Sequence, residues 1–234
     1  MTEVYWFEQT EADTPSTNDW LTASELATLN SLRFAKRRAD WRLGRWTAKR
    51  AVARYFKLPD EARALSGLEI RAAGDGAPEV FFEGQPAGVA ISISHRDGRA
   101  VCVVAPQGTE LGCDLEVIEP RSDAFIADYF TAEEQALVAR APASLRPRMV
   151  TLVWSAKESA LKALRQGLRL DTRCLTVNPH QAQAGVLWNA LKCHLDGQLF
   201  TGWWSTDEKF VRTLVALYCW PCASPSCCPP HFLL

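Results

Sequence analysis

The first stretch of this chain that could do chemistry is GCDLEV, residues 112–117, which places Asp114 and Glu116 two positions apart. Its alternation of apolar and polar residues is typical of a β-strand, so the two carboxylates share one face. Two oxygen donors on one face, with a third from elsewhere, suit Mg²⁺, which prefers hard oxygen ligands. By itself, this short motif is far more typical of a solvated acidic edge than of a metal site.

A second stretch, WSAKESALKAL, begins at Trp154 and has the pattern of an amphipathic helix. Trp154, Glu158 and Lys162 recur every four residues, which places them on nearly one helical face. Lys157 lies beside them. A surface ion pair between Glu158 and Lys162 is one interpretation. A site that handles phosphate is the other, because lysine donates to phosphate as a point charge.

The elements that must position these residues follow a repeating order. The pattern predicts a helical region over 23–57 with Ser24 as its N-cap, then a strand pair, and then a hairpin whose tip lies near SHRDG. After the 112–117 strand, the sequence predicts a helix capped by Thr131 and Glu134, a helix over about 148–164, and antiparallel strands. We therefore expect an α+β fold.

Each half of the chain carries roughly the same parts. We expect two similar α/β lobes in a pseudo-twofold arrangement, an N-terminal lobe of residues 1–108 and a C-terminal lobe of residues 109–234. Residues 219–234, rich in cysteine and proline, predict a loosely ordered tail. Removing the chain after Tyr218 should then leave activity intact.

Composition excludes several classes of function. The chain has 234 residues, 23% of them charged, with a formal net charge of −1, so no overall charge draws it to nucleic acid or membranes. No apolar run reaches the ~20 residues that span a bilayer, and the acidic start does not resemble a signal peptide. We expect a cytoplasmic protein whose four scattered cysteines are reduced and mostly buried.

The two chemical stretches together resemble the signature of the 4′-phosphopantetheinyl transferase superfamily. The pattern W-(S/T)-x-K-E-(A/S)-x-x-K is matched from Trp154 to Lys162, and Gly112, Asp114 and Glu116 match G-x-D-x-E. ISISHRDG, KRRADWRLGR and YFTAEE resemble three weaker blocks of the family. The length of the chain and the order of its predicted elements resemble the larger, monomeric, Sfp-like branch of the family. This resemblance implies a two-lobed 4′-phosphopantetheinyl transferase fold.

The resemblance implies transfer of the phosphopantetheine arm of coenzyme A to a carrier-protein serine, with release of 3′,5′-ADP. Asp114, Glu116 and Glu158 would hold Mg²⁺, or alternatively Mn²⁺, on the pyrophosphate. Lys162 would neutralise the pyrophosphate, and Lys157 would bind phosphate or assist proton movement. The base that activates the serine is left open between Glu158, a metal-bound water and Glu134.

For coenzyme A itself, the resemblance implies phosphate contacts from Arg38, Arg45, Ser94 and His95. One departure is Ala77, which stands where the family often has a lysine. That contact is either missing or supplied by another cation such as Arg71.

The implied partners are apo carrier domains of nonribosomal peptide, polyketide or fatty-acid synthases, with secondary metabolism favoured. Basic residues over 33–57 and near 140–148 could steer an acidic carrier, and residues 125–130 could form an apolar docking patch. The alternative is a degenerate homologue that binds coenzyme A or a carrier without transferring. A nucleic-acid binder using the 33–57 segment is the remaining rival, and it leaves both motifs unexplained.

Overall fold

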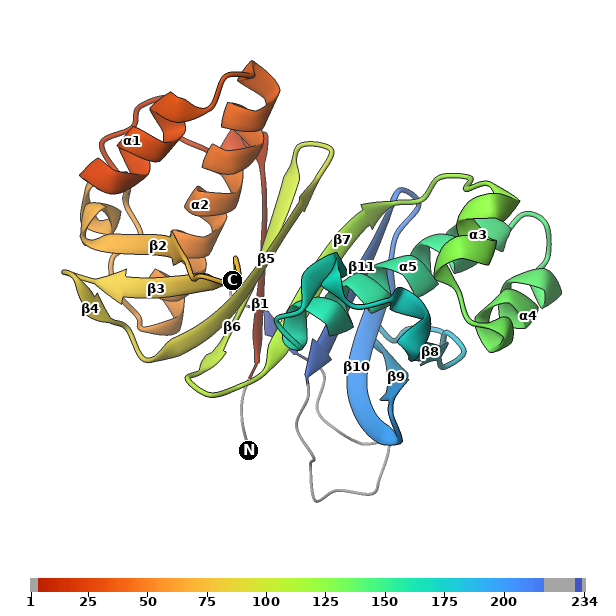
Figure 1. The fold of residues 1–234 in the computed structure, drawn as a ribbon. Coiled ribbons are helices and arrows are strands. Elements are labelled where there is room, and N and C mark those ends of the chain that lie inside the picture. Colours follow the sequence, from red (N-terminus) through yellow and green to blue (C-terminus); the bar gives the residue numbers. More distant parts are fainter. Residues whose placement is uncertain (1–3, 217–229, 233–234) are drawn as a thin grey trace. The chain divides into compact units, whose positions relative to one another are not determined.

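The computed structural model describes residues 4–216 and 230–232, and the chain divides into two compact units. The first unit comprises residues 1–109 and 230–234, and the second comprises residues 110–229 (Figure 1). Both units combine helices with antiparallel strands, which bears out the α+β prediction in its general form.

The described residues of the first unit form two α-helices and two sheets. Its helices are α1 (Ala23–Ser31) and α2 (Ala35–Tyr55), and short 3₁₀ helices cover Glu11–Asp13 and Ala62–Gly67. Its strands are β1 (Tyr5–Thr10), β2 (Leu68–Ala72), β3 (Pro78–Phe82), β4 (Gln85–Pro86), β5 (Val89–Arg96), β6 (Arg99–Pro106) and β12 (His231–Phe232). The strand orders are β12-β1-β6-β5 and β2-β3-β4.

Helix α2 carries the core of the first unit. Trp46, Ala48 and Val52 are buried and pack with Phe7 of β1 and Cys102 of β6. Small residues such as Ala48 let the helix approach the sheet closely, while the β-branched and aromatic residues fill the space between the two layers. The helix therefore holds its side chains in fixed positions over β1, β5 and β6.

The helical region predicted over 23–57 is two helices rather than one. Leu32 and Phe34 have extended backbone conformations, which end α1 and precede α2. The cap of α1 also differs from the prediction. Thr22, and not Ser24, is the N-cap, and its side chain forms a capping box with Glu25.

As far as residue 216, where its description ends, the second unit forms one five-stranded antiparallel sheet and three α-helices. The strand order is β7-β11-β10-β9-β8. Its strands are β7 (Leu111–Val117), β8 (Leu175–Pro179), β9 (Asn189–Leu195), β10 (Gln198–Thr206) and β11 (Phe210–Ala216). Its helices are α3 (Asp123–Tyr129), α4 (Ala132–Arg140) and α5 (Arg146–Ala163), with 3₁₀ helices at Gly167–Arg169 and Thr172–Cys174.

Helix α5 lies on this sheet and packs against β7, β11 and β8. Ala156 and Ala160 are fully buried there, in one cluster with Leu175, Val211 and Val215. A small-residue face is what a helix needs in order to pack tightly on a pleated surface. The predicted capping box of Thr131 and Glu134 is present at the start of α4.

The end of the chain departs from the sequence-based picture. Residues 217–229 and 233–234, including all four terminal cysteines, lie outside the described residues, so the tail prediction is answered only for 230–232. There, His231–Phe232 form β12, which pairs parallel with β1 of the first unit. Residues 230–232 therefore do not belong to a C-terminal lobe, as the sequence predicted, but complete the first unit's sheet.

Among the described part of the chain, no helix is both long enough and apolar enough to cross a membrane. Cys102, Cys113 and Cys193 are buried and free, whereas Cys174 is free but exposed. The expectation of reduced, mostly buried cysteines holds for these four.

Candidate active site

The candidate site is built where β7 meets α5, and Gly112 makes that meeting possible. A Cβ atom at this position would lie 2.0 Å from the carbonyl oxygen of Ser159 and 2.6 Å from the backbone nitrogen of Ala163. Both neighbours are backbone atoms of the helix and cannot rotate away. Only glycine therefore allows β7 to lie this close to α5, and the close approach brings Asp114 under the helix.

Asp114 is buried and held through both of its carboxylate oxygens. Ser155 donates its hydroxyl to Oδ2 at 2.9 Å, and Lys162 donates from Nζ to Oδ1 at 2.8 Å. Lys162 also donates to the carbonyl oxygen of Cys113 at 3.0 Å. A buried carboxylate is stable only when paired and hydrogen-bonded, and here α5 supplies both partners.

A hydroxyl network supports this arrangement from behind. The Thr213 hydroxyl on β11 lies 2.9 Å from the hydroxyl of Ser155 and 2.7 Å from that of Ser159. All three side chains are fully buried. The sequence analysis gave none of the three a role, although Ser155 and Ser159 stand inside the helical motif. Two serines on one face of a buried helix need a polar partner, and this requirement could have indicated the network.

The other two predicted ligands contribute negative charge to the same region. Burial raises the pKa of Glu158, and the neighbouring carboxylates Asp114 and Glu116 raise it further, against the opposing effect of Lys162. Glu116 also lies 3.8 Å from the guanidinium of Arg121. Asp114, Glu116, Glu158 and the Lys162 ammonium thus interact electrostatically around β7 and α5.

These carboxylates are not arranged as a finished metal centre. Within residues 4–216 and 230–232, no three His, Cys, Asp or Glu side chains are placed so that they could hold a metal ion. Lys162, with 28% of its side chain exposed, binds the Asp114 oxygen instead. The donor set still fits a hard divalent cation, because carboxylate oxygens are its preferred ligands and the repulsion that raises the pKa of Glu158 is what a cation relieves.

Lys157 and Glu134 lie in a different part of the second unit. Their side chains are fully buried, with Lys157 Nζ 2.8 Å from Glu134 Oε2. Lys157 also donates to the carbonyl oxygens of Thr172 and Leu175. Burial lowers the pKa of Lys157 and raises that of Glu134, while their mutual attraction opposes both changes. Neither side chain reaches solvent, in contrast to the phosphate or proton-transfer roles that the resemblance implied for them.

The predicted coenzyme A contacts fall in the first unit, where α2 crosses β5. A Cβ atom on Gly44 would lie 3.9 Å from Cδ2 of His95, so the helix and the strand meet beside this histidine. Arg45 follows Gly44 directly, and its guanidinium lies 5.0 Å from the ring centre of Trp41. Burial lowers the pKa of Arg45 against an opposing effect of Glu25. Ser94 is buried in β5 next to His95.

The other basic residues of α2 differ in how exposed they are. Arg38 is exposed, but Arg42 donates to the carbonyl oxygens of Pro15 and Thr17, and Lys49 is fully buried. The basic residues over 33–57 therefore do not form one continuous exposed surface, because Lys49 is turned into the protein. Arg71, suggested as a substitute for the cation missing at Ala77, pairs with Glu69 and stacks over the ring of Phe81.

The predicted docking residues form an aromatic cluster in the second unit. The ring of Phe125 lies 4.8 Å from that of Tyr129 and 5.0 Å from that of Trp154, and Tyr129 and Trp154 are 5.2 Å apart. Tyr129 has 38% of its surface exposed. The cluster gives Trp154 of the helical motif a packing role at the contact between α3 and α5.

Comparison with known proteins relates this chain to a family and to a curated relative. Residues 110–215, which contain β7 and α5, match the family model of the 4′-phosphopantetheinyl transferase superfamily. The chain is also 24% identical over 178 residues to the 4′-phosphopantetheinyl transferase HetI of Nostoc sp. (strain PCC 7120 / SAG 25.82 / UTEX 2576). That match covers 74% of this chain and 73% of the relative.

Proposed function

Since residues 110–215 place the chain in the 4′-phosphopantetheinyl transferase superfamily, we propose that it transfers the phosphopantetheine arm of coenzyme A to a serine of an apo carrier protein. The serine oxygen forms a bond to the phosphorus that bears the pantetheine arm, and the bond from that phosphorus to the bridging pyrophosphate oxygen breaks. The serine loses its proton, and 3′,5′-ADP leaves. The observation that carries the proposal is the group of carboxylates around Lys162 where β7 meets α5.

Charge neutralisation is the main requirement of such a reaction, because the pyrophosphate is highly negative. Asp114, Glu116 and Glu158 would hold Mg²⁺ or Mn²⁺, which when bound supplies positive charge to the pyrophosphate. Lys162 is the second source of positive charge. Its partly exposed ammonium group pairs with Asp114, and the Asp114 carboxylate helps keep the pKa of Lys162 raised against the effect of burial.

The base that takes the serine proton is Glu158 in this proposal. Glu158 belongs to the candidate site itself, on the helical face that also carries Lys162. Glu134, the other side chain considered for this role, is fully buried and occupied by Lys157 and two backbone amides. A base must reach the proton that it removes, directly or through one water, and the buried position of Glu134 argues against that.

Coenzyme A would use the first unit for its phosphates. Arg45 and Arg38 carry the positive charge on α2, and Ser94 and His95 lie on β5 beside Gly44. Arginine binds phosphate through paired N–H groups, which gives direction as well as charge. The pseudo-twofold arrangement of two lobes, a monomeric state, a cytoplasmic location and synthase carriers of secondary metabolism remain predictions within this proposal.

Intact mass of an apo carrier protein tests the proposal most directly. Incubation with this protein, coenzyme A and Mg²⁺ should increase the carrier mass by one phosphopantetheine group. Asp114→Ala, Glu158→Ala or EDTA should abolish the increase. Glu133→Ala is the matched control, since Glu133 is an exposed acid of the same unit and should leave the increase unchanged.

The alternative, a homologue that binds without transferring, gives a different result in the same experiment. Peptidyl, polyketide and fatty-acid carriers would all keep their original mass, although the folded protein would bind coenzyme A in a titration. Absence of coenzyme A binding as well would reject both versions.

A further inference from the structure

The buried pair of Lys157 and Glu134 belongs to a set of contacts that joins three elements of the second unit. Glu134 accepts from its own N-cap amide, Thr131 N, at 2.8 Å, and from Val177 N of β8 at 2.7 Å. Lys157 of α5 reaches Glu134 and the carbonyl oxygen of Thr172. Helix α4, helix α5 and strand β8 therefore meet at one fully satisfied ion pair, which we call the second clamp.

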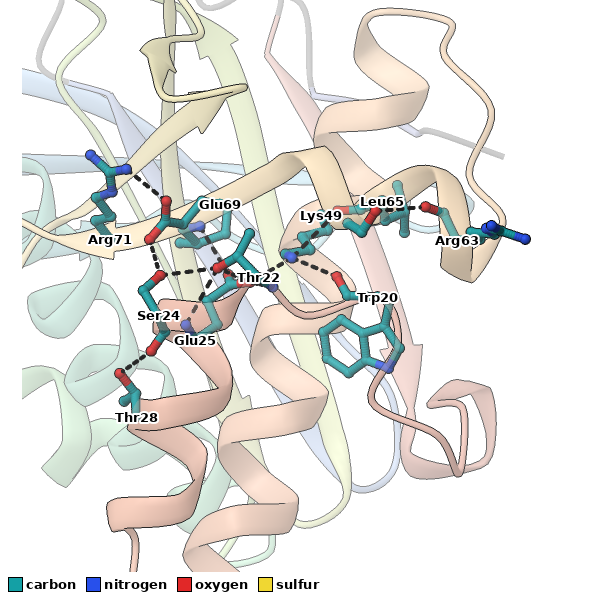
Figure 2. Close-up of polar contacts among 12 residues, drawn as sticks. Trp20, Thr22, Ser24, Glu25, Thr28, Lys49, Arg63, Leu65, Glu69 and Arg71 are labelled. Carbon is teal, nitrogen blue, oxygen red and sulfur yellow. Dashed lines mark hydrogen bonds and ion pairs between the residues drawn. The ribbon is translucent and has the colours of Figure 1, made fainter.

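The first unit contains the same set of contacts, which we call the first clamp (Figure 2). Glu25 accepts from its N-cap amide, Thr22 N, at 3.0 Å, and from Ile70 N of β2 at 3.0 Å. Lys49 of α2 lies 2.6 Å from Glu25 Oε2 and also donates to the carbonyl oxygens of Trp20 and Leu65. Both charged side chains are buried, as in the second clamp.

The correspondence extends along the two helices that carry the lysines. The segment WTAKRAVAR begins at Trp46 and WSAKESALK begins at Trp154, so each lysine follows a tryptophan by one helical turn. Aligned in this way, Arg50 of the first unit stands where the second has Glu158, and Arg54 stands where it has Lys162. The two helices thus share the clamp lysine but differ in the residues of the candidate site.

The strands beneath these two helices also correspond in position but differ in the residues of the candidate site. Phe7 pairs with Cys102 between β1 and β6, as Asp114 pairs with Thr213 between β7 and β11. The guanidinium of Arg54 lies 4.9 Å from the ring centre of Phe7, in the same relation that Lys162 has to Asp114. Phe7 and Gln9 therefore occupy the places of Asp114 and Glu116.

The clamp is thus present in a unit that has none of the three carboxylates of the candidate site at the corresponding positions. A lysine that served the cation-dependent transfer step would have no reason to be buried in the same contacts in a unit that lacks the three carboxylates. The first clamp accordingly separates the role of Lys157 from that of its neighbour Glu158, although the two residues are adjacent in one motif.

We propose that Lys157 and Glu134 are positioning residues that fix the rotation of α5, and thereby hold Glu158 beside Asp114 and Glu116. Adjacent residues of a helix point about 100° apart, so a side chain locked toward α4 and β8 turns its neighbour to a defined direction. Glu158 lies one helical turn before Lys162, which pairs with Asp114 at 2.8 Å, so the rotation of α5 decides whether Glu158 faces the carboxylates of β7. The inference rests on the proposed function, since it concerns the carboxylates assigned there to the cation.

The test compares matched double variants of the two clamps in the full-length protein. Lys157→Met with Glu134→Gln removes both charges of the second clamp, and Lys49→Met with Glu25→Gln does the same in the first. Removing both partners avoids leaving a single buried charge, which would destabilise the protein strongly. Mn²⁺ affinity is measured by electron paramagnetic resonance titration with coenzyme A present, and folding by circular dichroism.

The second-clamp double variant should lose at least about tenfold in Mn²⁺ affinity, the usual effect of removing residues that orient metal ligands. The first-clamp double variant should keep the native affinity. In steady-state assays, the second-clamp variant should lower kcat and leave KM for coenzyme A unchanged, because Lys157 does not touch the phosphates. A rise in KM without a change in Mn²⁺ affinity would instead assign Lys157 to phosphate binding and overturn the proposal.

Two other results also overturn it. Native Mn²⁺ affinity in the second-clamp variant, or an equal loss in both variants, would show that the pair has no specific effect on Glu158. If the native protein itself does not bind Mn²⁺, the proposed metal site fails, and the positioning role fails with it. Should the double variant not fold, Thr131→Ala and Thr22→Ala, which remove only the cap hydroxyls, give a milder matched pair with the same expected contrast.

Discussion

At the scale of single residues, Glu158 stands in an environment that disfavours its negative charge. Burial and the carboxylates of Asp114 and Glu116 raise its pKa above the ordinary value of 4.5. The folded protein therefore holds this proton more tightly than the unfolded chain does. The sequence predicted that these three carboxylates would gather, but it could not predict that Lys162 would bind Asp114 directly, because that contact depends on how closely β7 approaches α5.

Glu158→Gln should stabilise the protein at neutral pH in EDTA. Below about pH 4.5 the carboxyl of Glu158 is protonated in both the folded and the unfolded state, so it does not change the free energy of unfolding. As the pH rises through the raised pKa of the folded state, the buried negative charge lowers the free energy of unfolding of the unmutated protein, but not that of the variant. Thermal unfolding should show Tm higher by about 2–4 °C in the variant, as ~1 kcal/mol produces in a chain of this size.

Magnesium should reverse this order. The cation stabilises only the protein that binds it, so saturating Mg²⁺ should raise Tm for the native protein and leave Glu158→Gln unchanged. Equal Tm values for the two proteins in EDTA from pH 4 to pH 8 would contradict the assigned environment of Glu158.

At the scale of elements, the contact between β7 and α5 decides whether the site exists. The pattern of residues predicted both elements, and α5 begins and ends within two residues of the predicted range. It did not predict that Gly112 is the point of contact, since nothing in a strand's own pattern shows what lies above it. The division of the 23–57 region into α1 and α2 was also missed, because Leu32 and Phe34 are compatible with a helix by type.

Gly112→Ala should separate β7 from α5. Its Cβ atom would lie 2.0 Å from a backbone oxygen, so the strand has to move, and overpacking of this kind costs roughly 3 kcal/mol or more. Chemical denaturation measures the loss, and Mn²⁺ affinity should fall with it because Asp114 moves away from the helix. Gly74→Ala is the control: no heavy atom lies within 4 Å of a Cβ there, and the change should stay within about 0.5 kcal/mol. Native stability of Gly112→Ala would contradict the close approach.

At the scale of the whole molecule, the two clamps show an internal repeat that the element order only suggested. The two helical segments share only the tryptophan, alanine and lysine of WTAK and WSAK, a match too short to show a repeat by itself. Only the contacts reveal that Lys49 and Lys157 are counterparts. The sequence analysis therefore assigned Lys49 to a basic surface and Lys157 to phosphate binding, because the sequence does not show whether a lysine is buried or exposed.

Ending the chain at Pro229 should destabilise the first unit. This removes Pro230, which is buried, and β12, including the hydrogen bond from His231 N to Val4 O at 2.9 Å. Tm should fall by an amount that corresponds to about 1–2 kcal/mol, as expected for the loss of one or two backbone hydrogen bonds with some packing. His231→Ala, which keeps the backbone of β12, should have a smaller effect. An unchanged Tm after truncation would support the original view that the tail is dispensable.

The pairing of β12 with β1 also has a consequence for biosynthesis. Residues 231–232 follow every strand of the second unit in the sequence, so the ribosome makes them after β7–β11 are already complete. Domains that are continuous in sequence can fold as soon as they emerge during translation. The second unit can therefore form its sheet first, while the outer edge of β1 waits for its partner. The unpaired edge of β1 in the nascent chain stays exposed for the time needed to translate the second unit. During that time a chaperone could bind this edge, or another strand could pair with it incorrectly.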